Sequence, residues 1–282
     1  MLLGFNMLLW STHVTEEHFP LLAKIKAAGY DGVELPIFEG QPKTYERVGR
    51  EIKNDGLRVT AVCVIPNAER DCTSSDRNVR NRGLDHIKWA IDCLAAANGE
   101  VLCGPFYQPL AVFTGEPPTK AELAGIVEVH KQAAKYAASA NVKLSVEPLN
   151  RFECYALNTA GDAADIVRQV NEPNYGFLYD TFHANIEEKD PVGVIAPNIA
   201  EISHVHTSES DRGTPGKGHV PWDATLKALK AGGYDGWYVI EAFGRSLPAV
   251  AAATRVWRDF FPNTEEVYRY GHDFLRERWS KA

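Results

Sequence analysis

The sequence predicts an α/β protein, a (β/α)8 TIM barrel that forms a single domain over residues 1–282. Three observations predict it. Eight short apolar runs recur along the chain, and longer amphipathic stretches separate them. Units of about 35 residues would then fill the chain, which suits this barrel. A doubly wound open sheet is the alternative, but neither a Gly-x-Gly-x-x-Gly nor a Walker A phosphate-binding motif is present.

The eight expected strands are nearly continuous apolar runs, as is typical of parallel strands that are covered on both faces. They span residues 3–9, 32–36, 57–65, 100–104, 142–148, 175–181, 202–208 and 237–243. Amphipathic stretches between them predict helices over 16–28, 76–97, 120–140 and 159–170. Residues 263–279 predict an extra C-terminal helix beyond the eighth unit.

Composition and charge narrow the class of protein. Apolar residues make up 45% and charged residues 24%, which is ordinary for a soluble globular chain. The formal net charge of −7 disfavours nucleic acid as a partner, and no apolar run is long enough to span a membrane. Five cysteines without Cys-x-x-Cys spacing argue against a disulfide framework. We therefore expect a cytoplasmic protein without nucleic-acid or membrane partners.

The last four expected strands each end in a residue that can bind a metal ion. These residues are Glu147, Asp180, His206 and Glu241. Because strand carboxyl ends converge at one mouth of the barrel, the four side chains are expected to meet there. Two Glu, one Asp and one His form an oxygen-rich set that suits Mn²⁺, Mg²⁺ or Co²⁺ better than a thiolate-type zinc site.

Each strand-end residue taken alone has a simpler explanation. A single carboxylate at such a position is usually solvated, caps a helix or pairs with a basic residue. The occurrence of a ligand in four consecutive units favours a shared site, because carboxylates placed directly after apolar strands must be compensated. His204 lies two residues before His206 and shares its strand face, so it is an alternative ligand. Its deeper position favours a packed core histidine.

The same residues lie in motifs that resemble a known family. The sequence resembles the D-tagatose 3-epimerase and D-psicose (D-allulose) 3-epimerase family, within the xylose-isomerase-like TIM-barrel sugar isomerases and epimerases. The resemblance lies in EPLNRFE (147–153), NTA (158–160), YDTFHANIEE (179–188), HVHTSESDRGTPGKGHVPW (204–222), VIEAF (239–243) and TRVWRDF (254–260), with GFNMLLWS (4–11) as the first strand. Other loops depart from the better-known members, for instance over 65–71 and 106–118.

The resemblance implies one divalent metal per subunit, most often Mn²⁺, held by the four strand-end residues. It also implies that His183 and Arg212 bind substrate oxygens near the carbonyl, with Glu153 beside them. Each of the three has a structural alternative. His183 could cap a helix, Arg212 could be a solvated loop charge, and Glu153 could pair with Arg151.

The implied activity is a metal-dependent ketose 3-epimerase that interconverts C3 epimers of free ketoses through an enediolate. Glu147 and Glu241 would act as a two-glutamate pair, one abstracting the C3 proton and the other delivering a proton to the opposite face. Two alternatives stay open. One is another enediolate enzyme, such as an aldose–ketose isomerase, a hydroxypyruvate isomerase or an inosose dehydratase. The other is a catalytically silent sugar-binding barrel.

The N-terminal half is expected to supply residues that contact the rest of the sugar. The candidates follow the first four strands: Asn6, Trp10, Glu34, Phe38, Cys63, Asn67, Phe106 and Tyr107. Packing inside the loops or the core is the alternative for these residues, and Cys63 is expected to be an inert thiol. The resemblance also implies a homodimer or homotetramer. Its interface could include Trp257, Phe260, Phe261, Tyr268 and Tyr270.

Overall fold

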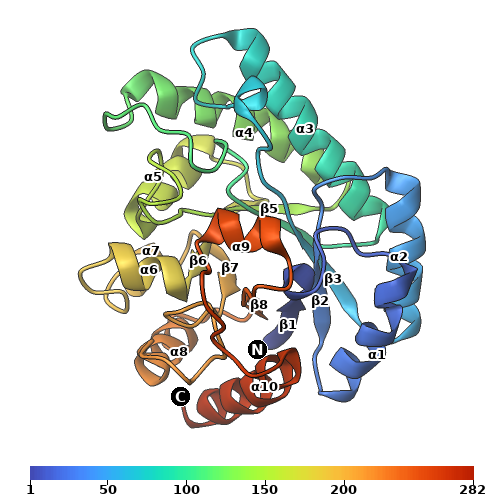
Figure 1. The fold of residues 1–282 in the computed structure, drawn as a ribbon. Coiled ribbons are helices and arrows are strands. Elements are labelled where there is room, and N and C mark those ends of the chain that lie inside the picture. Colours follow the sequence, from blue (N-terminus) through green and yellow to red (C-terminus); the bar gives the residue numbers. More distant parts are fainter.

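A computed structural model describes residues 1–282 and confirms the predicted fold class. Eight parallel strands follow one another around a closed barrel in chain order, and the last strand pairs with the first. Figure 1 shows the helices arranged as a ring around this sheet. The closure between first and last strands rules out the open doubly wound sheet.

All eight predicted strands are present, and most are shorter at their carboxyl ends than the apolar runs suggested. Their bounds are β1 (Leu2–Asn6), β2 (Gly32–Pro36), β3 (Arg58–Val62), β4 (Val101–Gly104), β5 (Lys143–Val146), β6 (Tyr175–Asp180), β7 (Ile202–His206) and β8 (Trp237–Ile240). After β1 the chain turns into the 3₁₀ helix η1 (Met7–Leu9), because the Asn6 side chain accepts a hydrogen bond from the Leu8 amide. The shorter strands place several polar side chains at the barrel mouth.

The helices form at and between the stretches that the amphipathic patterns marked. Their bounds are α1 (Phe19–Ala27), α2 (Pro42–Asn54), α3 (Arg77–Ala96), α4 (Lys120–Ser139), α5 (Ala160–Val170), α6 (Thr181–Glu187), α7 (Ile195–Asn198), α8 (Trp222–Ala231), α9 (Pro248–Thr254) and α10 (Thr264–Lys281), with 3₁₀ turns η2 (Glu16–His18) and η3 (Ala68–Arg70). Thr119 and Thr159 start α4 and α5 with capping boxes.

Two helices follow β8, one more than the repeat of one helix per strand requires. The long helix α10 lies in the outer ring near α8, and the short α9 crosses the face of the barrel in front of the strands (Figure 1). Arg276 of α10 binds the Met1 carbonyl and Asp31, which ties the end of the chain to its beginning. No helix of the structure has the length and hydrophobicity needed to cross a membrane.

Close packing between α2 and α3 gives a prediction for stability. A Cβ on Gly49 of α2 would lie 2.4 Å from the Ala97 carbonyl oxygen, and that backbone cannot easily yield. We expect Gly49→Ala to lower the free energy of unfolding by about 1–3 kcal/mol through overpacking.

Gly161 in the first turn of α5 is the matched control, because its Cβ would meet only the Thr159 side chain at 3.6 Å. We expect Gly161→Ala to leave stability unchanged or raise it by up to about 1 kcal/mol. Urea denaturation of both variants checks the pair. Equal effects at the two positions would contradict the packing argument.

Candidate active site

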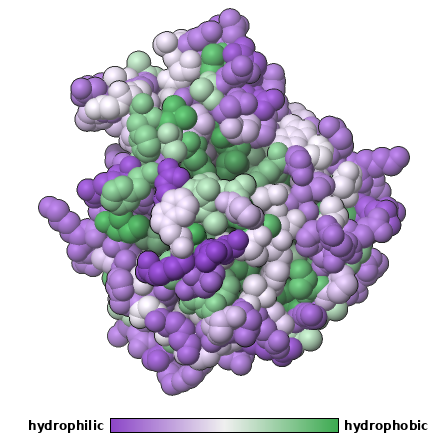
Figure 2. Space-filling view, viewed as in Figure 1, coloured by the Kyte–Doolittle hydropathy of each residue, from purple (hydrophilic) through white to green (hydrophobic).

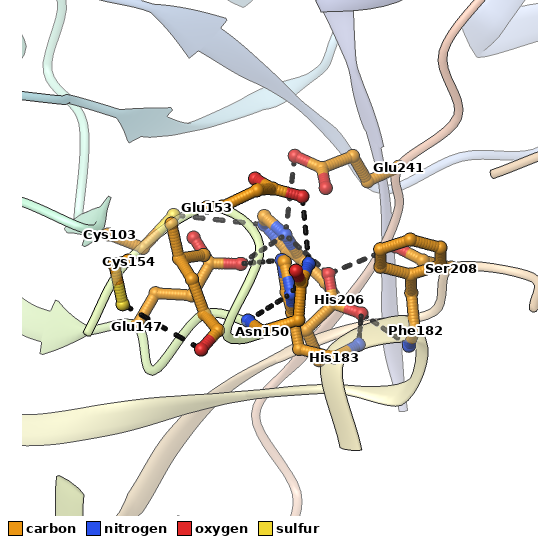
Figure 3. Close-up of polar contacts among 12 residues, drawn as sticks. Cys103, Glu147, Asn150, Glu153, Cys154, Phe182, His183, His206, Ser208 and Glu241 are labelled. Atoms are coloured by element: carbon orange, nitrogen blue, oxygen red, sulfur yellow. Dashed lines mark hydrogen bonds and ion pairs between the residues drawn. The ribbon is translucent and has the colours of Figure 1, made fainter. Parts of the chain in front are cut away.

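The four predicted strand-end residues meet at the barrel mouth. Asp180 and His206 are the last residues of β6 and β7, and Glu147 and Glu241 directly follow β5 and β8. One ligand atom from each lies within 4.8 Å of the others, and all four residues are buried. Figure 3 shows Glu147 and Glu241 on either side of the histidine rings, as expected from strands that arrive from different parts of the barrel.

The His206 ring is oriented toward the three carboxylates. Its Nε2 lies 2.7 Å from Glu34, so in the neutral ring the proton sits on Nε2 and Nδ1 is left with a lone pair. This Nδ1 is buried without a hydrogen-bond partner, at 3.5 Å from Glu241, 3.7 Å from Asp180 and 3.9 Å from Glu147. An orphaned imidazole nitrogen among three carboxylates fits a divalent cation.

The electrostatics of this cluster favour positive charge. Burial opposes ionisation of Asp180, but the Arg212 guanidinium nearby holds the pKa of this carboxyl well below its usual range. Burial raises the pKa of Glu147 well above its usual range, and the like charges of Glu241 and Asp180 raise it further. Three acidic groups packed this closely need a cation, and Arg212 supplies one.

Arg212 lies fully inside the site rather than in solvent. Its Nη1 donates to Glu241 at 2.6 Å and to Asp180 at 3.2 Å. The guanidinium is held between the rings of Phe182 and Phe243, at 3.9 and 4.8 Å from their centroids. The backbone of Arg212 has φ +65°, a left-handed conformation that a non-glycine residue adopts at a cost. The solvated-loop alternative for this residue is therefore wrong.

Glu209 organises the loop that carries Arg212, and the sequence patterns did not single it out. Its buried carboxylate accepts four hydrogen bonds, from the amides of Ser210, Gly216 and Val220 and from the Trp222 indole. These bonds close the loop on itself. The Arg212 amide in turn donates to the Glu209 carbonyl, and the Arg212 carbonyl accepts from Phe243 after β8. The sign of Glu209 in the sequence is an acidic residue in a loop rich in Gly, Ser and Thr.

His183 lies in α6, which Asp180 caps through its side chain. The backbone amide of Asn150 donates to Nδ1 of the His183 ring at 2.9 Å. Burial and the adjacent Arg212 cation lower the pKa of His183 to about 3, which keeps the ring neutral. Nε2 accepts a hydrogen bond from Nη2 of Arg212 at 2.9 Å and lies 3.7 Å from Glu147. The ring therefore holds the Arg212 guanidinium beside the carboxylates.

Glu153 lies at the same mouth, where Asn150 donates to its carboxylate at 2.8 Å. Burial raises its pKa. The alternative in which Glu153 pairs with Arg151 is wrong, because Arg151 points outward and binds Glu187. Glu153 is thus a buried carboxyl group that faces the cavity.

Glu34 is placed differently from the sequence prediction, which grouped it with residues that contact the sugar. It lies inside β2 and is fully buried below the site. Its two oxygens accept hydrogen bonds from side chains of four other strands: Asn6, Thr60, Cys103, His204 and His206. Because it accepts from Nε2 of His206 and from an Asn6 amide that also reaches Glu241 at 3.1 Å, Glu34 fixes two of the four strand-end residues. His204 is the packed core histidine that its position suggested.

Four of the eight N-terminal candidates, Asn6, Trp10, Cys63 and Phe106, do not line the cavity. Asn6 is buried and joins Glu34 to Glu241, and Trp10 packs against Phe5 and Tyr268. Phe106 is fully buried and packs on a histidine ring of α4. Cys63 is fully buried, and burial raises the pKa of its thiol to about 12. We correct these assignments: Trp10, Cys63 and Phe106 pack against other side chains, where burial of apolar surface is favourable, and Asn6 positions Glu241.

The cavity above the carboxylates has a volume of about 260 Å³. Figure 2 shows hydrophobic residues gathered around the centre of this face of the molecule. Of the further N-terminal candidates, Phe38 lines the cavity, whereas Asn67 caps η3 and Tyr107 is buried. The lining consists of Leu8, Thr12, Phe38, Val62, Val64, Pro105, Leu110, Glu147, Leu149, Glu153, His183, Arg212, Glu241, Phe243, Ala249, Val250, Ala253 and Thr254.

Comparison with known proteins points to one group of enzymes. The chain is 31% identical to a ketose 3-epimerase of Arthrobacter globiformis, over 99% of this chain and 96% of the relative. It is 30% identical to a probable ketose 3-epimerase of Synechocystis sp., over 98% of this chain and 96% of the relative. A solved D-allulose 3-epimerase from Methylomonas sp., in complex with D-allulose, superimposes with a TM-score of 0.92 at 27% identity, covering 99% of this chain and 97% of that one.

The family model described as "Xylose isomerase-like TIM barrel" matches residues 22–278, which is nearly the whole chain. The match includes the strand-end residues and the loops that carry His183 and Arg212. The closed barrel, the cluster at its mouth and the similarity along the full length agree with one another. The chain therefore belongs to the xylose isomerase-like TIM barrel family.

Proposed function

We propose that this chain is a metal-dependent 3-epimerase of free ketoses. The observation that carries the proposal is the pair Glu147 and Glu241, which enter one cavity from β5 and β8 beside His183 and Arg212. The relatives named ketose 3-epimerases, which match over nearly their full length, support it.

Inversion at C3 of a ketose needs two groups that exchange protons on opposite faces of the carbon. One glutamate would abstract the C3 proton as a carboxylate, and the other, protonated, would deliver a proton from the far side. Their roles would be exchanged in the reverse reaction. Glu147 and Glu241 suit these roles because they follow strands that lie three places apart in the barrel and both line the cavity.

Removal of the C3 proton places negative charge on O2, which the chain can stabilise directly. His183 Nε2 and Arg212 Nη2 both lie at the cavity, 2.9 Å apart, and a substrate oxygen placed beside them would accept a hydrogen bond from the Arg212 guanidinium. Asn150 holds the His183 ring in position through a hydrogen bond, and Glu209 does the same for the loop that carries Arg212. Preorganised donors of this kind act without rearranging during the reaction.

The residues that would hold the metal are Glu147, Asp180, His206 and Glu241. One divalent ion bound there would supply Lewis acidity toward the oxygens at C2 and C3. We propose Mn²⁺, with Mg²⁺ or Co²⁺ as alternatives, because three carboxylates and one imidazole make an oxygen-rich set.

The compartment and the assembly belong to the same proposal. The five cysteines are all free thiols, which supports the cytoplasm as the compartment. We propose a homodimer or homotetramer. Trp257 is 67% exposed and Tyr270 is 39% exposed, which supports an interface near the C-terminus, whereas Tyr268 is buried between α10 and the barrel.

The two glutamates give the first test of the mechanism. We expect Glu147→Gln and Glu241→Gln each to lower C3 epimerisation of a ketose by about 10²–10⁴-fold, because an amide cannot exchange the proton. Chromatography of the epimers in D₂O, with NMR to locate the deuterium, measures both rate and position. Wild-type protein should place the label at C3.

Glu277→Gln is the matched control, because Glu277 is an exposed glutamate of α10 that does not line the cavity. It should keep wild-type turnover. Epimerisation at the wild-type rate in either site variant would contradict the two-glutamate scheme. Label at C1 in place of C3 would instead favour an aldose–ketose isomerase.

Removal of the metal gives a second test. We expect chelation to abolish turnover and Mn²⁺ to restore it, with bound metal counted by mass spectrometry. Mn²⁺ should also raise the melting temperature of the stripped protein, because a ligand that binds only the folded state stabilises it. His206→Asn should lose most of that rise. Full turnover after complete removal of divalent ions would disprove metal dependence.

A further inference from the structure

The cavity has two chemically different walls. All five ionisable side chains that line it, from Glu147 to Glu241, follow strands β5 to β8. The facing wall is built from the segments after β1 to β4 and from α9, and its side chains are almost entirely hydrocarbon. Leu8, Phe38, Val64, Leu110 and Val250 are examples from five separate segments.

The facing wall offers few hydrogen-bonding side chains. Thr12 and Thr254 are its two hydroxyl groups. The Thr254 hydroxyl already donates to the Val250 carbonyl within α9 at 2.8 Å, so its proton is engaged. Thr12 alone is left to donate from a side chain on this wall.

The apolar wall is also a packed element. Leu8, Val62 and Phe243 form a separate hydrophobic cluster with Ala251 of α9, and Phe38 and Val250 pack against it. Because these side chains are hydrocarbon, they offer a ligand no hydrogen-bond partner. Helix α9 therefore closes the cavity with methyl groups, where a polar loop would have supplied hydroxyl or amide partners.

This asymmetry points to a substrate class, on the basis of the proposed epimerase. Carbons C1 to C3 must lie beside Glu147 and Glu241, so the other end of the sugar chain meets the apolar wall. We propose that the preferred substrate is a 6-deoxyketose, a ketohexose whose chain ends in a methyl group. A 6-hydroxyl buried against the hydrocarbon part of this wall, away from Thr12 and Thr254, would lose its water without gaining a partner, whereas a methyl group gains from burial.

The test compares D-fructose with 6-deoxy-D-fructose, and L-sorbose with 6-deoxy-L-sorbose, using metal-loaded protein. Removal of the 6-hydroxyl prevents closure of the six-membered ring, so each kcat/KM is divided by the open-chain fraction measured by NMR. We expect the 6-deoxy sugar of at least one pair to be favoured by about 10–100-fold, the range that one buried group confers in an apolar pocket.

Two isosteric variants test the wall itself. Val64→Thr and Val250→Thr each add a hydroxyl to the apolar wall, and at least one should lower the 6-deoxy preference by about threefold or more. The ratio between variant and wild type is independent of the ring forms in solution, because these cancel. Ala252→Ser is the control: Ala252 is exposed on α9 and does not line the cavity, so the preference should not change.

The outcomes separate this inference from the function on which it rests. Turnover of both sugars in each pair without a 6-deoxy preference would overturn the substrate class alone. A preference that neither threonine variant reduces would also overturn it, because the wall would not be its source. If none of the four ketoses exchanged its C3 hydrogen, the proposed epimerase would fall, and the substrate class with it.

Discussion

The buried carboxylate of Glu34 is the contact on which the geometry of the site depends. It sits in β2 below the mouth and accepts hydrogen bonds from Asn6, His204 and His206, among others. A fully buried carboxylate is costly unless donors surround it, and here donors from β1, β3, β4 and β7 converge on two oxygens. The orientation of His206 and Glu241 therefore depends on the relative positions of these strands in the barrel.

The network extends from this point to both sides of the cavity. Through the imidazole of His206 it sets which nitrogen faces the three carboxylates, and through Asn6 it reaches Glu241. On the other side of the cavity Glu209 supports Arg212, because its carboxylate accepts hydrogen bonds from backbone amides of the loop that carries Arg212. His206, Glu241 and the loop of Arg212 are thus each held by a second, buried polar group.

The repeating units and the residues at strand ends could be predicted from the sequence. Their period and spacing located all eight strands, and the convergence of strand carboxyl ends predicted that Glu147 and Glu241 meet at the barrel mouth. The supporting role of residues such as Glu34 and Asn6 could not be found in this way. Glu34 lies within an apolar run, and its partners come from strands far apart in the chain. Trp10 and Phe106 turned inward because large apolar rings gain more from burial than loops gain from exposing them.

The five thiols of the barrel have a practical consequence. Burial raises the pKa of Cys63 and Cys93 to about 12 and that of Cys154 to about 11, and it raises the pKa of Cys72 and Cys103 as well. None has the thiolate character or exposure that alkylating reagents need. A single cysteine introduced on the outer surface would be the one reactive thiol, so a fluorescent or spin label could be attached there without removing any native residue.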